Sequence, residues 1–296
     1  MNYKIAKTAG FCGGVKKAFL MVKEEFENKE KKGRVFILGS LVHNNNVMKT
    51  VRNMGIEKVN SLEEVAKGDT VIITAHGISK KVFEQIEEKG AKVFNATCPK
   101  VTMVQECAKE YFEKGFQIVI FGDKDHKEMK GINGWCENSA KILANFEEVD
   151  EFILGIEKNS EQKPILLISQ TTQNIANFNK VKKIVTEAIN SKHGIIEVVD
   201  TICRATFVRQ KEVFDIAREM DAIIVIGGRS SSNTKQLWKI VKKENSKTVW
   251  IEDPSELRNH DFKKILDSAS SVGIVSGAST SLEDIEEVKN IVESYK

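Results

Sequence analysis

Apolar residues along the chain follow two patterns that alternate with each other. Continuous runs, such as Ile118–Phe121 and Ala222–Ile226, are too short to span a bilayer and predict buried β-strands. Between such runs, apolar residues return every three or four positions, as at Val15, Ala18 and Val22, which is typical of a helix with one apolar face. Strands that alternate with helices predict parallel sheets joined by right-handed crossovers. We therefore expect an α/β fold.

A cysteine followed by an apolar run that ends in glycine occurs twice in the chain, at an offset of 105 residues. This offset aligns Cys98 with Cys203 and, without a gap, Ile118–Gly122 with Ile223–Gly227. A third, weaker copy begins at Cys12. The chain is predicted to hold three similar α/β modules, at residues 13–97, 98–202 and 203–296, with residues 1–12 supplying the first cysteine.

Each copy supplies one cysteine and two polar loops. The first loop holds His43, His126 and Ser231 at aligned positions, followed two residues later by Asn45, Glu128 and Asn233; the second loop holds His76, Thr171 and Ser279. Loops that follow strand C-termini form the ligand crevice of open parallel sheets. Three modules arranged with pseudo-threefold symmetry would direct these groups into one central cavity, where we expect the function to lie.

Charge and composition narrow the class of protein. The chain has 45 Lys+Arg against 42 Asp+Glu, so its net charge of +3 predicts neither a nucleic acid nor an anionic membrane as partner. Residues Met1–Gly10 lack the continuous apolar stretch of a secretory signal. We predict a cytoplasmic protein whose five cysteines stay reduced and form no disulfides.

Three of the five cysteines are candidate metal ligands. Cys12, Cys98 and Cys203 each precede a helical pattern, and a helix N-terminus stabilises the thiolate that binds metal. A lone cysteine is more often a small buried apolar residue, but recurrence in three copies favours ligation. Cys107 lies on the apolar face of a predicted helix and Cys136 has no counterpart in the other copies, so both are interpreted as structural.

Two kinds of metal centre fit three thiolates. Structural zinc prefers four protein ligands and CxxC pairs, which the sequence lacks, while a catalytic zinc with three protein ligands stays open. An iron-sulfur cube normally takes four cysteines. Three would leave one iron able to bind a substrate oxygen and deliver electrons, which predicts redox chemistry at a bound ligand.

A serine-rich turn is the candidate anion site. Ser230, Ser231, Ser232 and Asn233 follow a glycine pair and precede a helix expected to begin near Thr234. Such a turn is often only a helix cap, but a nest of N–H and hydroxyl donors also suits phosphate. It lacks the GK[ST] ending of a nucleotide-binding P-loop. The partners expected from the other copies are His43, His76 and Ser279, and histidines add positive charge and donors.

Glu128 is the one acidic residue among the aligned loop positions, and we expect it on a lysine-rich loop, Asp123–Lys130. An isolated glutamate is usually an exposed charge. Its alignment with Asn45 and Asn233 favours a role in the site instead. There, together with His126 and Thr171, its carboxyl is predicted to deliver protons.

With these residues in place, the sequence resembles the LytB family of 4-hydroxy-3-methylbut-2-enyl diphosphate reductases over nearly its whole length. The motifs that carry the resemblance are Gly10–Val15, Val42–Asn44, Ala75–Gly77, Ala96–Pro99, His126 with Glu128, Gln170–Thr172, Ile202–Cys203, Ser231–Asn233 and Gly277–Ser279.

The resemblance implies an oxidoreductase of isoprenoid biosynthesis that ends the methylerythritol phosphate pathway. It implies one 4Fe-4S cluster on Cys12, Cys98 and Cys203, whose apical iron takes the substrate hydroxyl. Two electrons, from a donor such as ferredoxin or flavodoxin, and two protons then remove that oxygen as water. The products are isopentenyl and dimethylallyl diphosphate. The substrate-binding set implied is His43, His76, His126, Thr171, Ser231, Ser232, Asn233 and Ser279, with Glu128, Thr171 and His126 forming the proton-delivery network.

One departure and two alternatives remain. Lys127 stands where relatives commonly have proline, between His126 and Glu128. A metal-dependent hydrolase or lyase acting on a phosphorylated metabolite, with Glu128 as base, would work without a reductant. A sensor that binds a cluster or phosphometabolite would not turn over at all, although the sequence contains no output domain.

Overall fold

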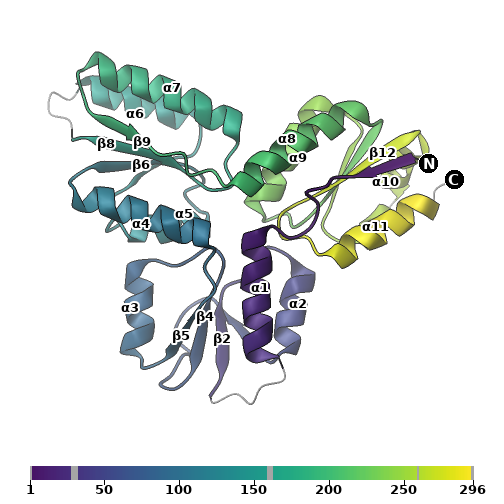
Figure 1. The fold of residues 1–296 in the computed structure, drawn as a ribbon, viewed down its shortest axis with the longest axis horizontal. Helices are drawn as coiled ribbons and strands as arrows, with labels where there is room; N and C mark the ends of the chain where they lie inside the picture. Colours follow the sequence, from purple (N-terminus) through teal and green to yellow (C-terminus); the bar gives the residue numbers. More distant parts are fainter. Residues whose placement is uncertain (1, 28–32, 159–162, 259, 295–296) are drawn as a thin grey trace. The chain divides into compact units, whose positions relative to one another are not determined.

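The structure is a computed structural model that describes residues 2–27, 33–158, 163–258 and 260–294. The chain divides into two compact units. One comprises Met1–Lys29, Ser40–Lys58 and Arg204–Lys296, and the other comprises Glu30–Gly39 and Val59–Cys203. The described residues form three sheets of four strands (Figure 1).

The three sheets share one strand order. The first strand of each sheet is an edge strand that leads into one of the three candidate cysteines. Beside it lies the strand that precedes the second polar loop, and beside that the strand that precedes the first polar loop. A second edge strand completes the sheet. The orders are β1(Asn2–Ile5)-β12(Ser271–Ser276)-β10(Ala222–Ile226)-β11(Thr248–Ile251), β5(Lys92–Asn95)-β4(Thr70–Ile73)-β2(Val35–Leu38)-β3(Glu57–Val59), and β9(Ile196–Val198)-β8(Ile165–Ser169)-β6(Gln117–Phe121)-β7(Lys141–Leu143).

Helices connect the parallel strands. In chain order they are α1(Gly13–Phe26), α2(Asn45–Asn53), α3(Lys80–Glu88), α4(Pro99–Glu113), α5(Lys127–Gly134), α6(Phe146–Lys158), α7(Ile175–Ser191), α8(Arg204–Glu219), α9(Ser232–Glu244), α10(His260–Asp267) and α11(Leu282–Ser294), with a short 3-10 helix at Pro254–Arg258. The predicted α/β class, with three similar parallel-sheet modules, is confirmed.

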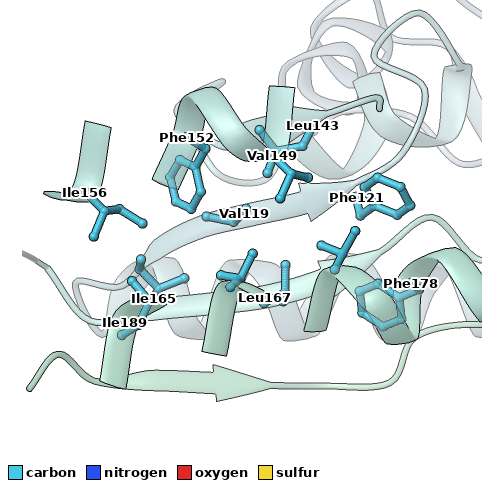
Figure 2. Packing of buried hydrophobic residues seen from close by; sticks show 12 residues of the cluster. Val119, Phe121, Leu143, Val149, Phe152, Ile156, Ile165, Leu167, Phe178 and Ile189 are labelled. Atoms are coloured by element: carbon cyan, nitrogen blue, oxygen red, sulfur yellow. The ribbon is translucent and has the colours of Figure 1, made fainter. Parts of the chain in front are cut away.

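The sheet that contains β6 and β8 shows why these sequences form buried strands. Alternate residues of a strand point to opposite faces. In β6, Val119 and Phe121 pack with α6 and α7, while Ile118 and Ile120 pack with α4 and α5. Figure 2 shows the first of these clusters, including Phe178 of α7. Both faces are covered, which explains the continuous apolar run rather than an alternating one.

The sheet that contains β10 and β12 repeats this arrangement. Ile224 and Ile226 join the cluster with α11, and Ile223 and Val225 join the cluster with α8 and α9. In the sheet of β2 and β4, one face packs on Val82 and Ile86 of α3. The predicted strands at 118–121 and 222–226 are therefore buried as expected.

The boundaries of the three modules near residues 97 and 202, and their arrangement around a central cavity, stay predictions. Among the described helices, none is both long and apolar enough to cross a membrane.

Removing the ring of Phe178 is expected to destabilise the fold. Its side chain is fully buried in the cluster of Figure 2, and a phenylalanine-to-alanine change in such a core costs about 3–5 kcal/mol. Phe178→Ala should therefore lower the free energy of unfolding by that amount in urea denaturation. Leu154→Ala is the matched control, because Leu154 lies on the neighbouring α6 with 53% of its surface exposed. Equal effects of the two changes would contradict this packing.

Candidate functional site

The predicted site residues fall into two sets, one in each unit. The unit that contains Arg204–Lys296 holds Cys12, His43, Ser231, Ser232, Asn233 and Ser279, and the other holds His76, Cys98, His126, Glu128, Thr171 and Cys203.

The three candidate ligand cysteines lie at helix starts, as predicted. Cys12 is the N-cap of α1, and its Sγ accepts the N–H of Val15 at 3.4 Å. Cys98 is the N-cap of α4, with Pro99 at the first helical position. Cys203 directly precedes α8. All three are half-buried, and each sulfur lies next to the positive end of a helix dipole.

The backbone of each of these cysteines is held in the same way. The N–H of Cys12 donates to the carbonyl of Ala278 at 3.0 Å, that of Cys98 to Ala75 at 3.1 Å, and that of Cys203 to Thr171 at 2.9 Å. Each acceptor belongs to the second polar loop on the neighbouring strand of the same sheet. Every module thus places its cysteine directly beside that loop.

The other two cysteines have a different environment. Cys136 is fully buried among aliphatic and aromatic side chains, and Cys107 packs against the same cluster. Burial, together with the nearby Cys107 thiol, raises the pKa of Cys136 to about 12. Burial also raises the pKa of Cys107. These environments suppress thiolate formation, which agrees with a structural role.

Glu128 is a buried carboxyl that pairs with Thr171. Its side chain is 2% exposed, and its carboxylate accepts two hydrogen bonds from Thr171, from the backbone N–H at 2.7 Å and from the hydroxyl at 2.8 Å. Burial raises the pKa of Glu128, and the two bonds from Thr171 oppose that rise without cancelling it. The carboxyl therefore keeps its proton to higher pH than an ordinary glutamate does, as a proton donor requires.

Glu128 lies on a helix, so the expectation that it belongs to a loop is wrong. α5 begins at Lys127, because the His126 side chain caps it: Nδ1 of His126 accepts the N–H of Glu128 at 3.2 Å. Since that nitrogen accepts, a neutral His126 carries its proton on Nε2. The rings of His76 and His126 meet edge to face, with centroids 5.4 Å apart. His76, His126 and the pair of Glu128 and Thr171 are thus brought to the same end of one unit.

The serine-rich turn forms the start of α9 in the other unit. The helix begins at Ser232, two residues earlier than expected, because the hydroxyl of Ser231 accepts the N–H of Thr234 at 3.3 Å. Asn233 is 5% exposed, and its amide nitrogen has no partner among the described residues. A buried donor without a partner at a helix N-terminus suits an anionic ligand.

His43 lies beside this turn. Its Nδ1 is 3.2 Å from the hydroxyl of Ser230, and its backbone carbonyl accepts the hydroxyl of Ser279 at 3.2 Å. A Cβ at Gly228 would overlap that carbonyl, so glycine is required for this approach. The next residue, Asn44, caps α2 by accepting the N–H of Val47 at 2.9 Å. The structure therefore brings together the predicted residues His43, Ser231, Asn233 and Ser279.

Arg209 is a buried positioning residue that the sequence interpretation missed. It is 3% exposed on α8, and its guanidinium donates to the carbonyls of Gly10 at 2.9 Å and Ser276 at 3.0 Å. It thereby ties the segment before Cys12 to the loop that carries Ser279. The sequence does contain a signal that could have identified Arg209. Arg209 precedes the buried Val213 and Ile216 by four and seven residues, a spacing that places all three on the core face of the helix.

The two sets offer complementary chemistry. One contains neutral donors at a helix start beside an imidazole, which can hold a phosphate group. The other contains a buried carboxyl of raised pKa beside two further imidazoles, which can transfer protons. The half-buried thiols at helix starts are suited to binding a metal centre.

Comparisons with known proteins give a consistent result. The model of the LytB protein family matches residues 4–293. A relative from Caldanaerobacter subterraneus subsp. tengcongensis, named 4-hydroxy-3-methylbut-2-enyl diphosphate reductase, is 39% identical over all of this chain and 98% of its own length. The chain spans 42% of the longer relatives of that name from Clostridium acetobutylicum and Clostridium tetani.

Two solved structures are also similar. One, of (E)-4-hydroxy-3-methyl-but-2-enyl diphosphate reductase, is described as the terminal enzyme of the non-mevalonate pathway; it is 34% identical, with a TM-score of 0.67 over 99% of this chain and all of that one. The other, the E-1-hydroxy-2-methyl-but-2-enyl-4-diphosphate reductase from Plasmodium falciparum, is 25% identical, with a TM-score of 0.85 over 98% of this chain and 87% of that one. The protein is therefore an α/β enzyme of the oxidoreductase class. The chain belongs to the LytB protein family.

The raised pKa of Glu128 predicts a pH-dependent stability. Between the ordinary pKa of glutamate and the raised pKa, the folded protein keeps a proton that the unfolded chain has lost, so this group favours folding more as pH falls. Glu128→Gln removes this dependence. Melting temperatures measured at pH 5 and pH 8 should show the variant gaining stability relative to the parent at the higher pH, by up to about 1.4 kcal/mol per pH unit within that window. The exposed Glu106→Gln is the control, and a pH-independent difference for Glu128→Gln would contradict burial as the cause.

Proposed function

We propose that this protein is a reductase of 4-hydroxy-3-methylbut-2-enyl diphosphate, which it converts to isopentenyl and dimethylallyl diphosphate at the end of the methylerythritol phosphate pathway. In that reaction two electrons and two protons replace the carbon–oxygen bond of the hydroxyl by a carbon–hydrogen bond and release water. Among observations within the chain, the buried carboxyl of Glu128 carries the proposal, because burial raises its pKa and so favours the protonated form that a proton donor needs.

The donor set fits one 4Fe-4S cluster on Cys12, Cys98 and Cys203. The three thiols are half-buried and placed at helix starts, whereas Cys107 and Cys136 pack in an apolar cluster. When bound, the cluster would pass electrons from an external donor to the substrate and offer an iron with an open position for the substrate oxygen. That the three sulfur atoms meet is part of the proposal.

The diphosphate would be held by the start of α9 and the histidines. Asn233 contributes a buried amide donor, and Ser231 and Ser232 contribute hydroxyl and backbone groups at the same helix end. His43 and Ser279 lie beside them in that unit. We assign His76, His126 and Thr171 to the substrate as well, in agreement with the family resemblance.

Glu128 would deliver the protons. Thr171 fixes both oxygens of its carboxylate, so the carboxyl is oriented before substrate arrives. His126 is oriented by its cap to the N–H of Glu128, which leaves Nε2 as its proton-bearing atom. His76 packs on that ring and keeps it in place.

The electrons would come from a donor protein such as ferredoxin or flavodoxin. We place the reaction in the cytoplasm, with neither a nucleic acid nor a membrane as partner, in line with the net charge of +3.

Replacing a ligand cysteine should remove the metal selectively. Cys98→Ser is expected to lose most of the roughly four irons per chain of an anaerobic preparation, because an oxygen ligand replaces the thiolate. Cys107→Ser is the matched control on the same helix and should keep its iron. Iron and sulfide analysis with an electronic absorption spectrum measures both. A zinc-loaded, colourless parent protein would refute the cluster.

Removing the acid should slow turnover without changing the cluster. Glu128→Gln keeps an acceptor for Thr171 but cannot donate a carboxyl proton, so kcat with dithionite as reductant should fall by about 10²–10⁴-fold. Iron content and substrate binding should remain at parental levels, and the exposed Glu106→Gln should behave like the parent. Turnover by the parent without any reductant would instead indicate a hydrolase or lyase.

A further inference from the structure

A cavity lies beside α5, the helix that carries Glu128. Its volume is about 810 Å³, within the range of small-molecule sites, and all of its lining residues belong to one unit. The walls come from the end of β2, the segments after β3 and β4, one side of α3 along its length and one face of α5. Leu38, Leu62, Ile78 and Val82 give it a mainly apolar floor.

The charges around this floor favour an anion. Lys89, Lys127 and Lys130 line the cavity against two acidic residues, Glu63 and Glu88. Gly39 adopts a φ of +87°, and a Cβ there would overlap the Lys127 ammonium. Glycine at position 39 therefore gives the ammonium of Lys127 room at the wall of the cavity.

The same helix joins the cavity to the candidate site. Three residues of α5 line the cavity, namely Lys127, Lys130 and Gly131. Glu128, one residue after Lys127, is instead hydrogen-bonded to Thr171. Residues one apart on a helix point in clearly different directions. A group that displaces Lys127 and Lys130 therefore acts on the short helix that holds the carboxyl.

The loop at residues 76–79 makes a second connection. The carbonyl of Ile78, a lining residue, accepts both the indole N–H of Trp135 at 3.0 Å and the amide of Gln105 at 3.2 Å. Two residues earlier, the ring of His76 packs on His126. The loop that forms part of the cavity wall therefore also carries His76, which packs on His126 beside the proposed proton donor Glu128.

We propose that this cavity binds an amphipathic organic anion, an apolar body with a phosphate-type head group, and that occupancy lowers turnover through α5. The apolar floor receives the body, and Lys127 and Lys130 receive the head group. The binding part stands on the cavity itself, while the effect on turnover rests on the proposed function.

Calorimetric titration of the holoenzyme with geranyl diphosphate tests the binding part. The background is Asn233→Ala, which weakens anion binding at the start of α9. In it, one equivalent should bind, and Lys127→Gln/Lys130→Gln should weaken binding at least tenfold, equivalent to about 1.4 kcal/mol. Inorganic diphosphate and geraniol, which are the head and body alone, should each bind at least tenfold more weakly than the complete molecule.

Two further variants separate binding from folding. Lys127→Arg/Lys130→Arg should retain binding, and Val82→Trp, which fills the cavity, should abolish it while melting near the parental temperature. Lys124→Gln/Lys183→Gln is the charge-matched control on exposed lysines outside the cavity. Equal affinity in the lysine-to-glutamine and control variants, or inorganic diphosphate binding as tightly as geranyl diphosphate, would overturn the proposal.

Kinetics test the coupling separately. In the otherwise unaltered enzyme, geranyl diphosphate should reduce kcat with little change in KM, and Lys127→Gln/Lys130→Gln should be insensitive to it. Purely competitive inhibition would place the ligand in the candidate site and contradict the coupling. If no variant reduces any substrate, the proposed function fails, while the calorimetric result still decides whether the cavity is a binding site.

Discussion

A backbone hydrogen bond recurs beside Cys12, Cys98 and Cys203, and the candidate chemistry depends on it. In each sheet, the edge strand that leads into the cysteine pairs in parallel with the strand that carries a polar loop, and the cysteine N–H donates to that loop. Each bond is worth only about 0.5–1.5 kcal/mol. The bond matters for position rather than for stability. This single contact holds the cysteine at its helix start and keeps the polar loop beside it.

The environment of Glu128 shows how an uncharged partner can orient a carboxyl group while burial still raises its pKa. An arginine or lysine at this place would lower the pKa of the carboxyl and keep it ionised. The donors are instead the backbone N–H and hydroxyl of Thr171, which orient both oxygens without adding charge. Burial then dominates and raises the pKa. Thr171 also accepts the N–H of Cys203, so one residue orients the acid and fixes a candidate metal ligand.

Much of this could be predicted from the sequence because the repeated signals are local. Continuous apolar runs predicted strands covered on both faces, and alternate residues of β6 and β10 do pack into separate clusters. The thiols at helix starts followed from apolar spacing and from Pro99.

Helix boundaries were less predictable. α5 and α9 begin at Lys127 and Ser232 because the side chains of His126 and Ser231 accept backbone N–H groups, a geometry that periodicity does not record. Arg209 and the cavity beside α5 depend on contacts between distant segments, which no local pattern contains.

The N-caps of α2, α5 and α9 illustrate how triplicated modules can diverge. Asn44, His126 and Ser231 each accept a backbone N–H, although one offers an amide oxygen, one an imidazole nitrogen and one a hydroxyl. Because capping needs only an acceptor, the helix start tolerates different chemical types at little cost to folding. The same strand–loop–helix scaffold therefore presents an amide, an imidazole or a hydroxyl at its helix start without a change in how the helix begins.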